Sequence, residues 1–336
     1  MRGNETQNVL LCTINDGGNI SQILATYAFY VTIRGMGCNP VIYEEGGRLD
    51  TKISEYIRAR CCISSDMHVH SSAEEYLDTF DIMLTGGERK WECRGDETLD
   101  TCFLHFGRED AGRIAYAPSF GDGCGLPLGP KNTAAFLLKR FDKIGAADIG
   151  TLSLLDTEFG ISADEVCSPI LLIDRYPHFD IGEIEGLFIF AFFEKYDGRK
   201  HAAVEMAEKT IKYRVEDYSM DSANAFHKSV DEYLNAVEKS SLIITDSPAV
   251  TQLAIVYEKP FILMISRKEN VFHLPLLANL GLEERIIYVE DDIHEKKYLC
   301  RKPIKYGAVS ARLKELRLSS ARWLEDCLAA KGHYGS

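Results

Sequence analysis

Short apolar runs alternate with amphipathic stretches along the chain. Near the N-terminus, NVLLCTI (8–14) precedes ISQILATYAFYVTIRGMG (20–37), where apolar residues recur at helical spacing, and NPVIYEE (39–45) follows as a second strand. A strand, a helix that ends in glycine and another strand predict a right-handed βαβ crossover. The runs FDIMLTGGERKW (80–91) and RIAYAPSFG (113–121) each end in a small-residue turn and predict further buried strands.

The same alternation resumes after a turn-rich stretch, DRYPHFDIGEIEG (174–186), which is a candidate linker. The later segments predict strands at 187–193, 242–246 and 261–265, helices at 198–211 and 229–240, and an amphipathic closing helix at 311–330. We therefore expect an α/β protein with two Rossmann-like domains, mostly parallel sheets and helices on both sheet faces. The expected domains are 1–175 and 176–336, with the terminal helix returning toward the first.

Composition narrows the classes of partner. The 336 residues are 46% hydrophobic and 26% charged, as in globular proteins, and the formal net charge is −13. That charge argues against a general nucleic-acid surface or an anionic-membrane surface, but it leaves room for a local basic pocket. The chain shows neither a signal peptide nor an apolar run long enough to span a bilayer, so we expect a cytoplasmic protein without an integral membrane segment.

Metal and redox motifs are weak in this sequence. The ten cysteines are scattered without a C-x-x-C pair, which favours buried reduced thiols over a zinc ribbon. His68 and His70 form H-V-H in an acidic, serine-rich stretch without an evident third ligand, so a surface loop is expected there. We predict no metal and no cofactor.

The segment SSLIITDSPAVTQLAIVYEKPFILMI (240–265) has the form of a strand, a polar turn, a helix and a strand. Thr245 is expected to end a central parallel strand of the second domain, with Asp246 and Ser247 at the mouth of an interdomain cleft and Pro248 in the first turn of the next helix. Ser247 or Asp246 is expected to cap that helix. The glycine loop NDGGN (15–19) lacks the spacing of a phosphate-binding fingerprint and favours a plain turn.

Several stretches together resemble the polysaccharide pyruvyl transferase family. TDSPAVTQLAIVYEKPFI is similar to the family's T-D-[S/R]-x-H-G turn and following kPfi, LTGGERKW to its G-S-D-x-x-W, and RIAYAPSFG to its k-i-a-Y-A-x-S-f-G. The opening helix, FDKIGAADIGTLSLL (141–155), VCSPILLI (166–173) and FHLPLLANLGLEERI (272–286) follow in the family's order. The resemblance implies two Rossmann-like domains in a GT-B-like arrangement. It also implies transfer of pyruvyl from phosphoenolpyruvate to a sugar as a ketal.

The resemblance fails at the positions that carry the family's chemistry. Ala147 stands where the arginine of the R-E turn would be, Ser247 where many members have a second arginine, and Ala249 where the histidine would be. The catalytic residues are therefore unknown, and groups such as Arg113 are considered as substitutes. The candidate substrate-binding residues are Asn19, Glu88, Arg89, Lys90, Ser119, Thr245, Asp246 and Ser247.

Three functions remain open at this point. The first is a transferase of surface polysaccharide biosynthesis that takes phosphoenolpyruvate and a sugar or lipid-linked glycan acceptor. The second is a non-catalytic relative that binds a glycan or a partner protein. The third is a GT-B-type glycosyltransferase that uses a sugar nucleotide. A homo-oligomer is also left open.

Overall fold

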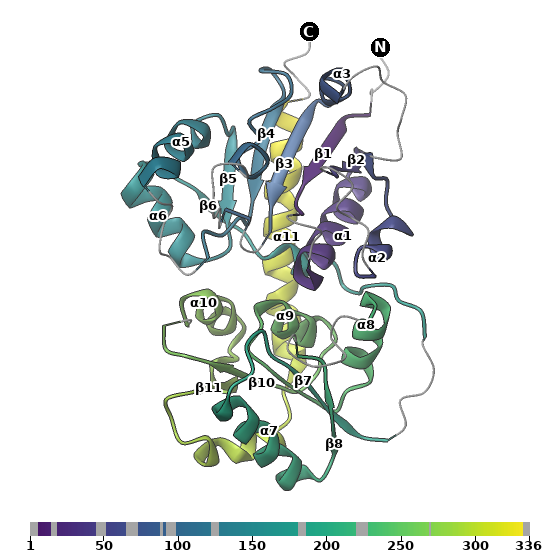
Figure 1. The fold of residues 1–336 in the computed structure, drawn as a ribbon, viewed down its shortest axis with the longest axis vertical. Coiled ribbons are helices and arrows are strands. Elements are labelled where there is room, and N and C mark those ends of the chain that lie inside the picture. The colour runs from purple at the N-terminus through teal and green to yellow at the C-terminus, as the bar shows by residue number, and fades with distance from the viewer. Residues whose placement is uncertain are drawn as a thin grey trace. The chain divides into compact units, whose positions relative to one another are not determined.

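The structure is a computed structural model. It describes residues 6–14, 19–44, 52–64, 73–87, 90–91, 99–121, 128–180, 186–219, 228–268 and 270–331. The chain divides into two compact units, which we call the first domain (Met1–Leu172 with Glu315–Ser336) and the second domain (Ile173–Lys314). Each is built on its own parallel sheet (Figure 1).

The first domain contains a six-stranded sheet in the order β2-β1-β3-β4-β5-β6, and every neighbouring pair is parallel. Its strands are β1 (Asn8–Cys12), β2 (Asn39–Ile42), β3 (Ile82–Gly86), β4 (Gly112–Tyr116), β5 (Lys143–Ala146) and β6 (Asp164–Glu165). Its helices are α1 (Ile20–Gly35), α2 (Glu55–Arg58), α3 (Ala73–Leu77), α4 (Leu99–Cys102), α5 (Leu128–Leu138), α6 (Ile149–Phe159) and the 3₁₀ helix η3 (Pro169–Leu172). The central strands β3 and β4 are buried along their whole length, which explains their continuous apolar runs.

Gly86, the last residue of β3, lies against the backbone of β4. A Cβ atom at this position would lie 1.9 Å from the Tyr116 carbonyl oxygen, which cannot move without breaking the sheet. We expect Gly86→Ala to lower the free energy of unfolding of the first domain by about 1–3 kcal/mol or more, because overpacked sites force backbone shifts. Gly35→Ala is the control, because a methyl group at Gly35 meets open space within a helix, where alanine is the better helix former. Urea unfolding of both variants measures the difference, and equal midpoints would contradict the expectation.

The second domain contains a five-stranded parallel sheet in the order β11-β10-β9-β7-β8. Its strands are β7 (Phe188–Phe192), β8 (Arg214–Asp217), β9 (Leu242–Thr245), β10 (Phe261–Ile265) and β11 (Ile286–Tyr288). Its helices are α7 (Gly198–Ile211), α8 (Val230–Lys239), α9 (Pro248–Val256), α10 (Asn270–Leu280) and the 3₁₀ helices η5 (Glu283–Arg285) and η6 (Ile293–Cys300). The fold class expected from the sequence, with Rossmann-like parallel sheets surrounded by helices, is confirmed.

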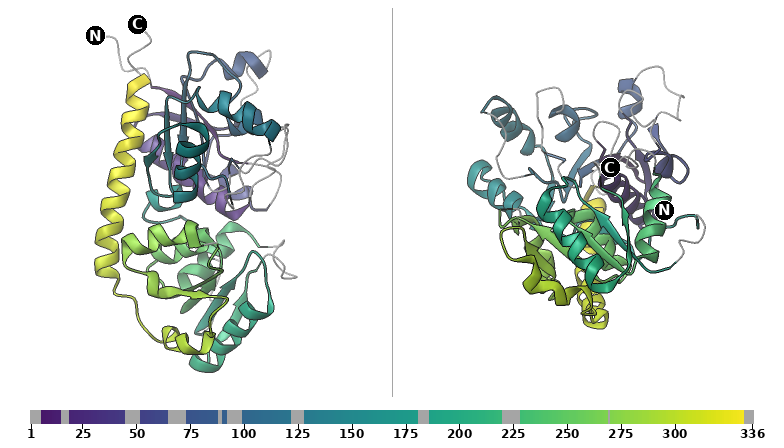
Figure 2. Two further views of the ribbon diagram at one scale, coloured as in Figure 1. Left: turned by 90° about the vertical axis from the view of Figure 1, so that its left-hand side faces the viewer. Right: turned by 60° about the horizontal axis from the view of Figure 1, so that its bottom comes forward.

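The last helix, α11 (Tyr306–Lys331), is one continuous helix, drawn in yellow in Figure 2. Its C-terminal half belongs to the first domain. There the Ser320 hydroxyl accepts a hydrogen bond from the Cys167 backbone N–H at 2.8 Å, and the Trp323 indole N–H donates to Asp164 at 2.7 Å. These contacts attach the helix to the β6 edge of the first sheet.

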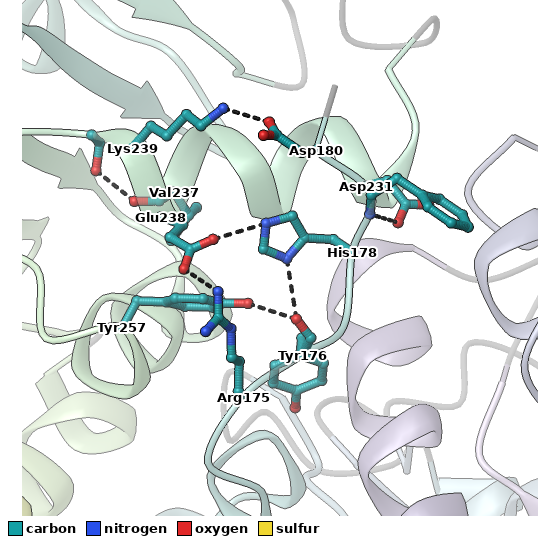
Figure 3. Close-up of polar contacts among 11 residues, drawn as sticks. Arg175, Tyr176, His178, Asp180, Asp231, Val237, Glu238, Lys239 and Tyr257 are labelled. Carbon is teal, nitrogen blue, oxygen red and sulfur yellow. Dashed lines mark hydrogen bonds and ion pairs between the residues drawn. The ribbon is translucent and has the colours of Figure 1, made fainter. Parts of the chain in front are cut away.

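The segment at the start of the second domain is held by side chains of α8 and by Tyr257, which directly follows α9 (Figure 3). His178 is almost completely buried, and its two ring nitrogens lie 2.9 Å from a Glu238 carboxylate oxygen and 3.1 Å from the Tyr176 carbonyl oxygen. The Tyr257 hydroxyl donates to the same carbonyl at 3.0 Å, and Arg175 pairs with Glu238. The part of the candidate linker that the structure describes is therefore packed on the second domain.

None of the described helices is both long enough and apolar enough to cross a membrane.

Candidate functional site

The order of strands in the second sheet creates a topological switch point between β7 and β9. From β7 the chain crosses through α7 to β8 on one side, and from β9, on the other side of β7, it crosses through α9 to β10 in the opposite direction. At such a switch point the two connections leave in opposite directions, and the crevice outside the carboxyl ends of the strands is where open α/β sheets bind ligands. The residues that follow Phe192 and Thr245 lie at this switch point.

A nearly buried ion pair occupies the switch point. The Lys200 ammonium, in the first turn of α7, lies 2.6 Å from a carboxylate oxygen of Asp246, and both side chains are only 10% exposed. The second oxygen of Asp246 accepts the Glu194 backbone N–H at 2.8 Å. Lys200 also donates to the Lys195 carbonyl at 2.7 Å. Asp246 therefore fixes the loop after β7 and holds one cation at the carboxyl edge.

The α9 N-terminus lies next to this pair. Pro248 is the first helical residue, as expected, and the backbone N–H of Ser247 donates to the Thr245 hydroxyl at 3.0 Å. The expected cap is wrong, because the Ser247 side chain makes no capping hydrogen bond and the Asp246 carboxylate is engaged by Lys200 and Glu194. Neither Ser247 nor Asp246 thus accepts the first N–H groups of α9 through its side chain, and a helix N-terminus of this kind favours an anion.

Further cations lie on the loop that enters α7. Lys195 and Arg199 are exposed, and they flank Asp197, whose carboxylate caps α7 by accepting the N–H groups of Arg199 and Lys200. The carboxyl edge of this sheet therefore combines a held ammonium, an uncapped helix N-terminus and two exposed cations. Such a set can bind a phosphate or a carboxylate through charge-assisted hydrogen bonds.

The candidates Asn19, Lys90 and Ser119 belong to the first domain. Asn19 caps α1 by accepting the Gln22 N–H at 3.0 Å. Lys90 is 1% exposed, and its ammonium donates to the Ile14 carbonyl at 3.3 Å, across the carboxyl ends of β1 and β3. Glu88, Arg89 and the NDGG residues 15–18 lie outside the described residues, as do His68 and His70.

Arg113 is a structural residue, so the suggestion that it supplies a substitute catalytic cation is wrong. The side chain is buried, and all five guanidinium N–H groups donate to backbone carbonyls. The acceptors are the carbonyl oxygens of Leu104, Phe106, Arg108, Glu109 and Ala111, at 3.0–3.3 Å. No donor of Arg113 is left for a substrate, because a guanidinium has only five.

Asp148 is a buried carboxyl group that the sequence analysis did not single out. It follows β5, caps α6 by accepting the Thr151 N–H at 2.7 Å, and is hydrogen-bonded to Ser119 after β4. Burial raises the pKa of Asp148, although hydrogen bonds from Thr151, Ser119 and Gly150 oppose the rise. The signal that could have found it is an aspartate directly after a strand and before a helix, which is the N-cap pattern.

The raised pKa of Asp148 predicts a pH dependence of stability. The folded state binds this proton more tightly than the unfolded state does, so the contribution of Asp148 to stability is greatest at low pH. It falls as pH rises from the ordinary aspartate pKa through the raised one. Asp148→Asn keeps an N-cap acceptor and removes the titration. Urea unfolding of both proteins across the acidic range should therefore show a wild-type decline that the variant lacks, and parallel curves would contradict this assignment.

Among the described residues, no group of three or more His, Cys, Asp and Glu side chains is placed to hold a metal ion.

Comparisons with known proteins identify the fold and leave the family open. No family model matches the chain, and no curated protein matches it. The putative UDP-N-acetylglucosamine 2-epimerase of Listeria monocytogenes is similar in structure, with a TM-score of 0.53 at 13% identity, over 95% of this chain and 91% of that one. A UDP-glucosyltransferase from Polygonum tinctorium covers 99% of both chains at 9% identity and a TM-score of 0.48. At these identities the first match supports the two-domain fold alone.

Proposed function

We propose that the protein is a sugar-modifying enzyme of GT-B-like fold, which binds the phosphate groups of a sugar nucleotide at the carboxyl edge of its second sheet. The observation that carries this proposal is the Lys200–Asp246 pair at the β7/β9 switch point, beside the uncapped N-terminus of α9. The proposal takes up the third function left open by the sequence.

The chemistry of the switch point suits a diphosphate. An ammonium group has three N–H donors. Among the described residues, Lys200 donates to Asp246 and to the Lys195 carbonyl, and its ammonium also lies 5.8 Å from the centroid of the Phe193 ring, so one donor is not used by a hydrogen bond to these residues. The backbone donors of α9 supply a second contact of the same sign, and Lys195 and Arg199 supply a positive potential at the rim. Two separate anion-binding groups suit a ligand with two phosphates better than a ligand with a single carboxylate.

The fold supports a sugar as the other part of the ligand. The similar solved structure described above carries the name of a putative UDP-N-acetylglucosamine 2-epimerase. The negative net charge of the protein requires that an anionic ligand be bound by local groups, which the switch point provides. The site therefore favours a soluble, phosphorylated sugar donor over nucleic acid.

The test separates charge from helix capping at Ser247. Aspartate and asparagine are similar in size and cap helices about equally well, and only aspartate places a negative charge where the phosphate would bind. Because Ser247 is buried, the melting temperatures of the free Ser247→Asp and Ser247→Asn variants are compared first to establish that both are folded. We expect UDP-glucose, UDP-N-acetylglucosamine or ADP-glucose to raise the melting temperature of the wild type and of Ser247→Asn. In Ser247→Asp the affinity should fall at least about tenfold, the size of a lost charge-assisted contact.

Two results would overturn the proposal. One is the absence of stabilisation of the wild type by any sugar nucleotide at millimolar concentration, because a ligand at 100 times its Kd stabilises by about 2.7 kcal/mol. The other is equal binding to the aspartate and asparagine variants, which would place the phosphate elsewhere.

Pyruvyl transfer from phosphoenolpyruvate is the second candidate. The observation that favours it is the position of Thr245, Asp246 and Ser247 at the end of a central strand with Pro248 opening the helix, which is the layout that the family resemblance implies. Against it, Ala249 is buried at 1% exposure where the family has its histidine.

Phosphate release distinguishes the two candidates. The full chain is incubated with phosphoenolpyruvate and galactose- or mannose-containing acceptors, and inorganic phosphate is measured. Release that depends on the acceptor would favour pyruvyl transfer. Binding of a glycan without turnover of either donor would favour a non-catalytic relative.

A further inference from the structure

A cation–π pair follows the two strands next to the switch point. Arg267 comes two residues after β10, and Tyr288 is the last residue of β11, which pairs with β10 in parallel. The guanidinium carbon of Arg267 lies 4.3 Å from the centroid of the Tyr288 ring. At this distance the cation is attracted to the face of the ring.

Neighbouring groups fix the position of this pair. An Arg267 guanidinium nitrogen lies 2.6 Å from an Asp291 carboxylate oxygen, and the Arg267 backbone N–H donates to Glu290 at 3.2 Å. The Asp291 backbone N–H in turn donates to the Tyr288 carbonyl at 2.9 Å, which closes a tight turn directly after the strand. The ring and both carboxylates thus lie at or directly after the end of β11, and the guanidinium contacts the Tyr288 ring and the Asp291 carboxylate.

The pair remains accessible. The Arg267 side chain is 58% exposed, so a guanidinium that lies against the Tyr288 ring still presents surface to solvent. An exposed ion pair of this kind contributes little to stability. The arrangement is therefore available for a ligand without being required for folding.

We propose that Arg267 and Tyr288 form a nucleoside subsite, in which the base of a nucleoside diphosphate stacks on the exposed guanidinium. This inference rests on the proposed function, because it assigns the nucleoside end of the same ligand. Planar guanidinium groups and aromatic rings are the surfaces on which bases stack in proteins. The carboxylates of Glu290 and Asp291 lie beside the pair and can accept hydrogen bonds from ribose hydroxyls.

The spacing of the strands suits one bound nucleotide. The α9 N-terminus follows β9, and Tyr288 ends β11, two positions away in the sheet. Neighbouring strands lie about 4.8 Å apart, so the two places are about 10 Å apart along the carboxyl edge. A ribose between a diphosphate and a base spans a comparable distance. The phosphates would bind at α9 and the base at Arg267.

The experiment compares two probes on four forms of the full chain. Calorimetric titration with UDP and with inorganic pyrophosphate is carried out on the wild type, Arg267→Lys, Tyr288→Leu and Tyr288→Phe. Lysine keeps the positive charge but lacks the planar guanidinium group. Leucine removes the aromatic ring that supports the guanidinium, and phenylalanine keeps that ring. ADP titrations show whether the subsite also accepts a purine base.

We expect Arg267→Lys and Tyr288→Leu to bind UDP about tenfold more weakly than the wild type, as the loss of base stacking predicts. Pyrophosphate binding should stay within about twofold in all variants, and Tyr288→Phe should match the wild type with both probes. Unchanged melting temperatures confirm that the variants are folded.

The contradicting outcomes are distinct. Equal losses for UDP and pyrophosphate, or UDP binding that is unaffected in Arg267→Lys, would overturn the nucleoside subsite and leave the phosphate site in place. A wild-type protein that binds neither probe would overturn the proposed function and this inference together.

Discussion

Asp246→Ala is expected to lower the free energy of unfolding of the second domain by about 3–5 kcal/mol, because it leaves the nearly buried ammonium of Lys200 without its counterion. The same change removes the carboxylate that accepts the Glu194 backbone N–H, so the loop after β7 and the first turn of α7 each lose a contact with the residue that follows β9. Sugar-nucleotide binding should be lost as well, since Lys200 would no longer be held at the switch point.

The matched control is Glu284→Ala, which removes the partner of Lys302 in an exposed pair of the same domain. We expect that change to cost no more than about 1 kcal/mol. Both tryptophans, Trp91 and Trp323, belong to the first domain, so their fluorescence does not report on this region. Hydrogen exchange of amides in β7 and β9 measures the effect directly. Similar protection in the two variants would show that the Asp246 pair is unimportant for the fold.

Arg113→Ala is expected to destabilise the first domain by at least about 4 kcal/mol. The change leaves five backbone carbonyls, between Leu104 and Ala111, without their guanidinium donors in a buried region. Each hydrogen bond to a charged group contributes roughly 1.5–3 kcal/mol, and the losses are not additive. Burial lowers the pKa of Arg113, because a charged guanidinium is less stable away from water. The five carbonyl acceptors compensate for this loss of hydration.

Tryptophan fluorescence is the measurement for this variant, because Trp91 is fully buried and donates its indole N–H to the Cys102 carbonyl within the same domain. Arg113→Lys should lie between the wild type and Arg113→Ala, since an ammonium has three donors for the five acceptors. Lys139→Ala, at an exposed position of the same domain, should shift the urea midpoint little. A midpoint for Arg113→Ala close to that of Lys139→Ala would return Arg113 to the list of functional candidates.

Local periodicity was sufficient to predict most of the elements. The segment GRKHAAVEMAEKTI was predicted as a helix and is α7, Gly198–Ile211, because apolar positions at helical spacing produce one buried face. LFIFAFF was predicted as a strand and contains β7, whose five residues are all buried between helices. Pro248 opens α9 because proline lacks only an N–H that would have had no partner inside the helix.

The candidate site was predicted only in part. The sequence placed Thr245, Asp246 and Ser247 after a central strand, since that position depends on neighbours along the chain. It did not identify Lys200 as the partner of Asp246, because the two residues are 46 positions apart and meet only when β7 and β9 pair. The capping prediction failed for the same reason, since a tertiary contact competes for the Asp246 carboxylate.

The secondary-structure elements could be predicted from the sequence, whereas the order of the strands in each sheet could not. Hydrophobic period and turn chemistry act over a few residues, so the sequence by itself determined the alternation of strands and helices in both halves of the chain. Which strands become neighbours depends on the free energy of packing the whole domain. Tertiary structure alone therefore decided that Arg113 donates to backbone carbonyls, that Asp148 is hydrogen-bonded to Ser119, and that the Arg267 guanidinium packs on the Tyr288 ring.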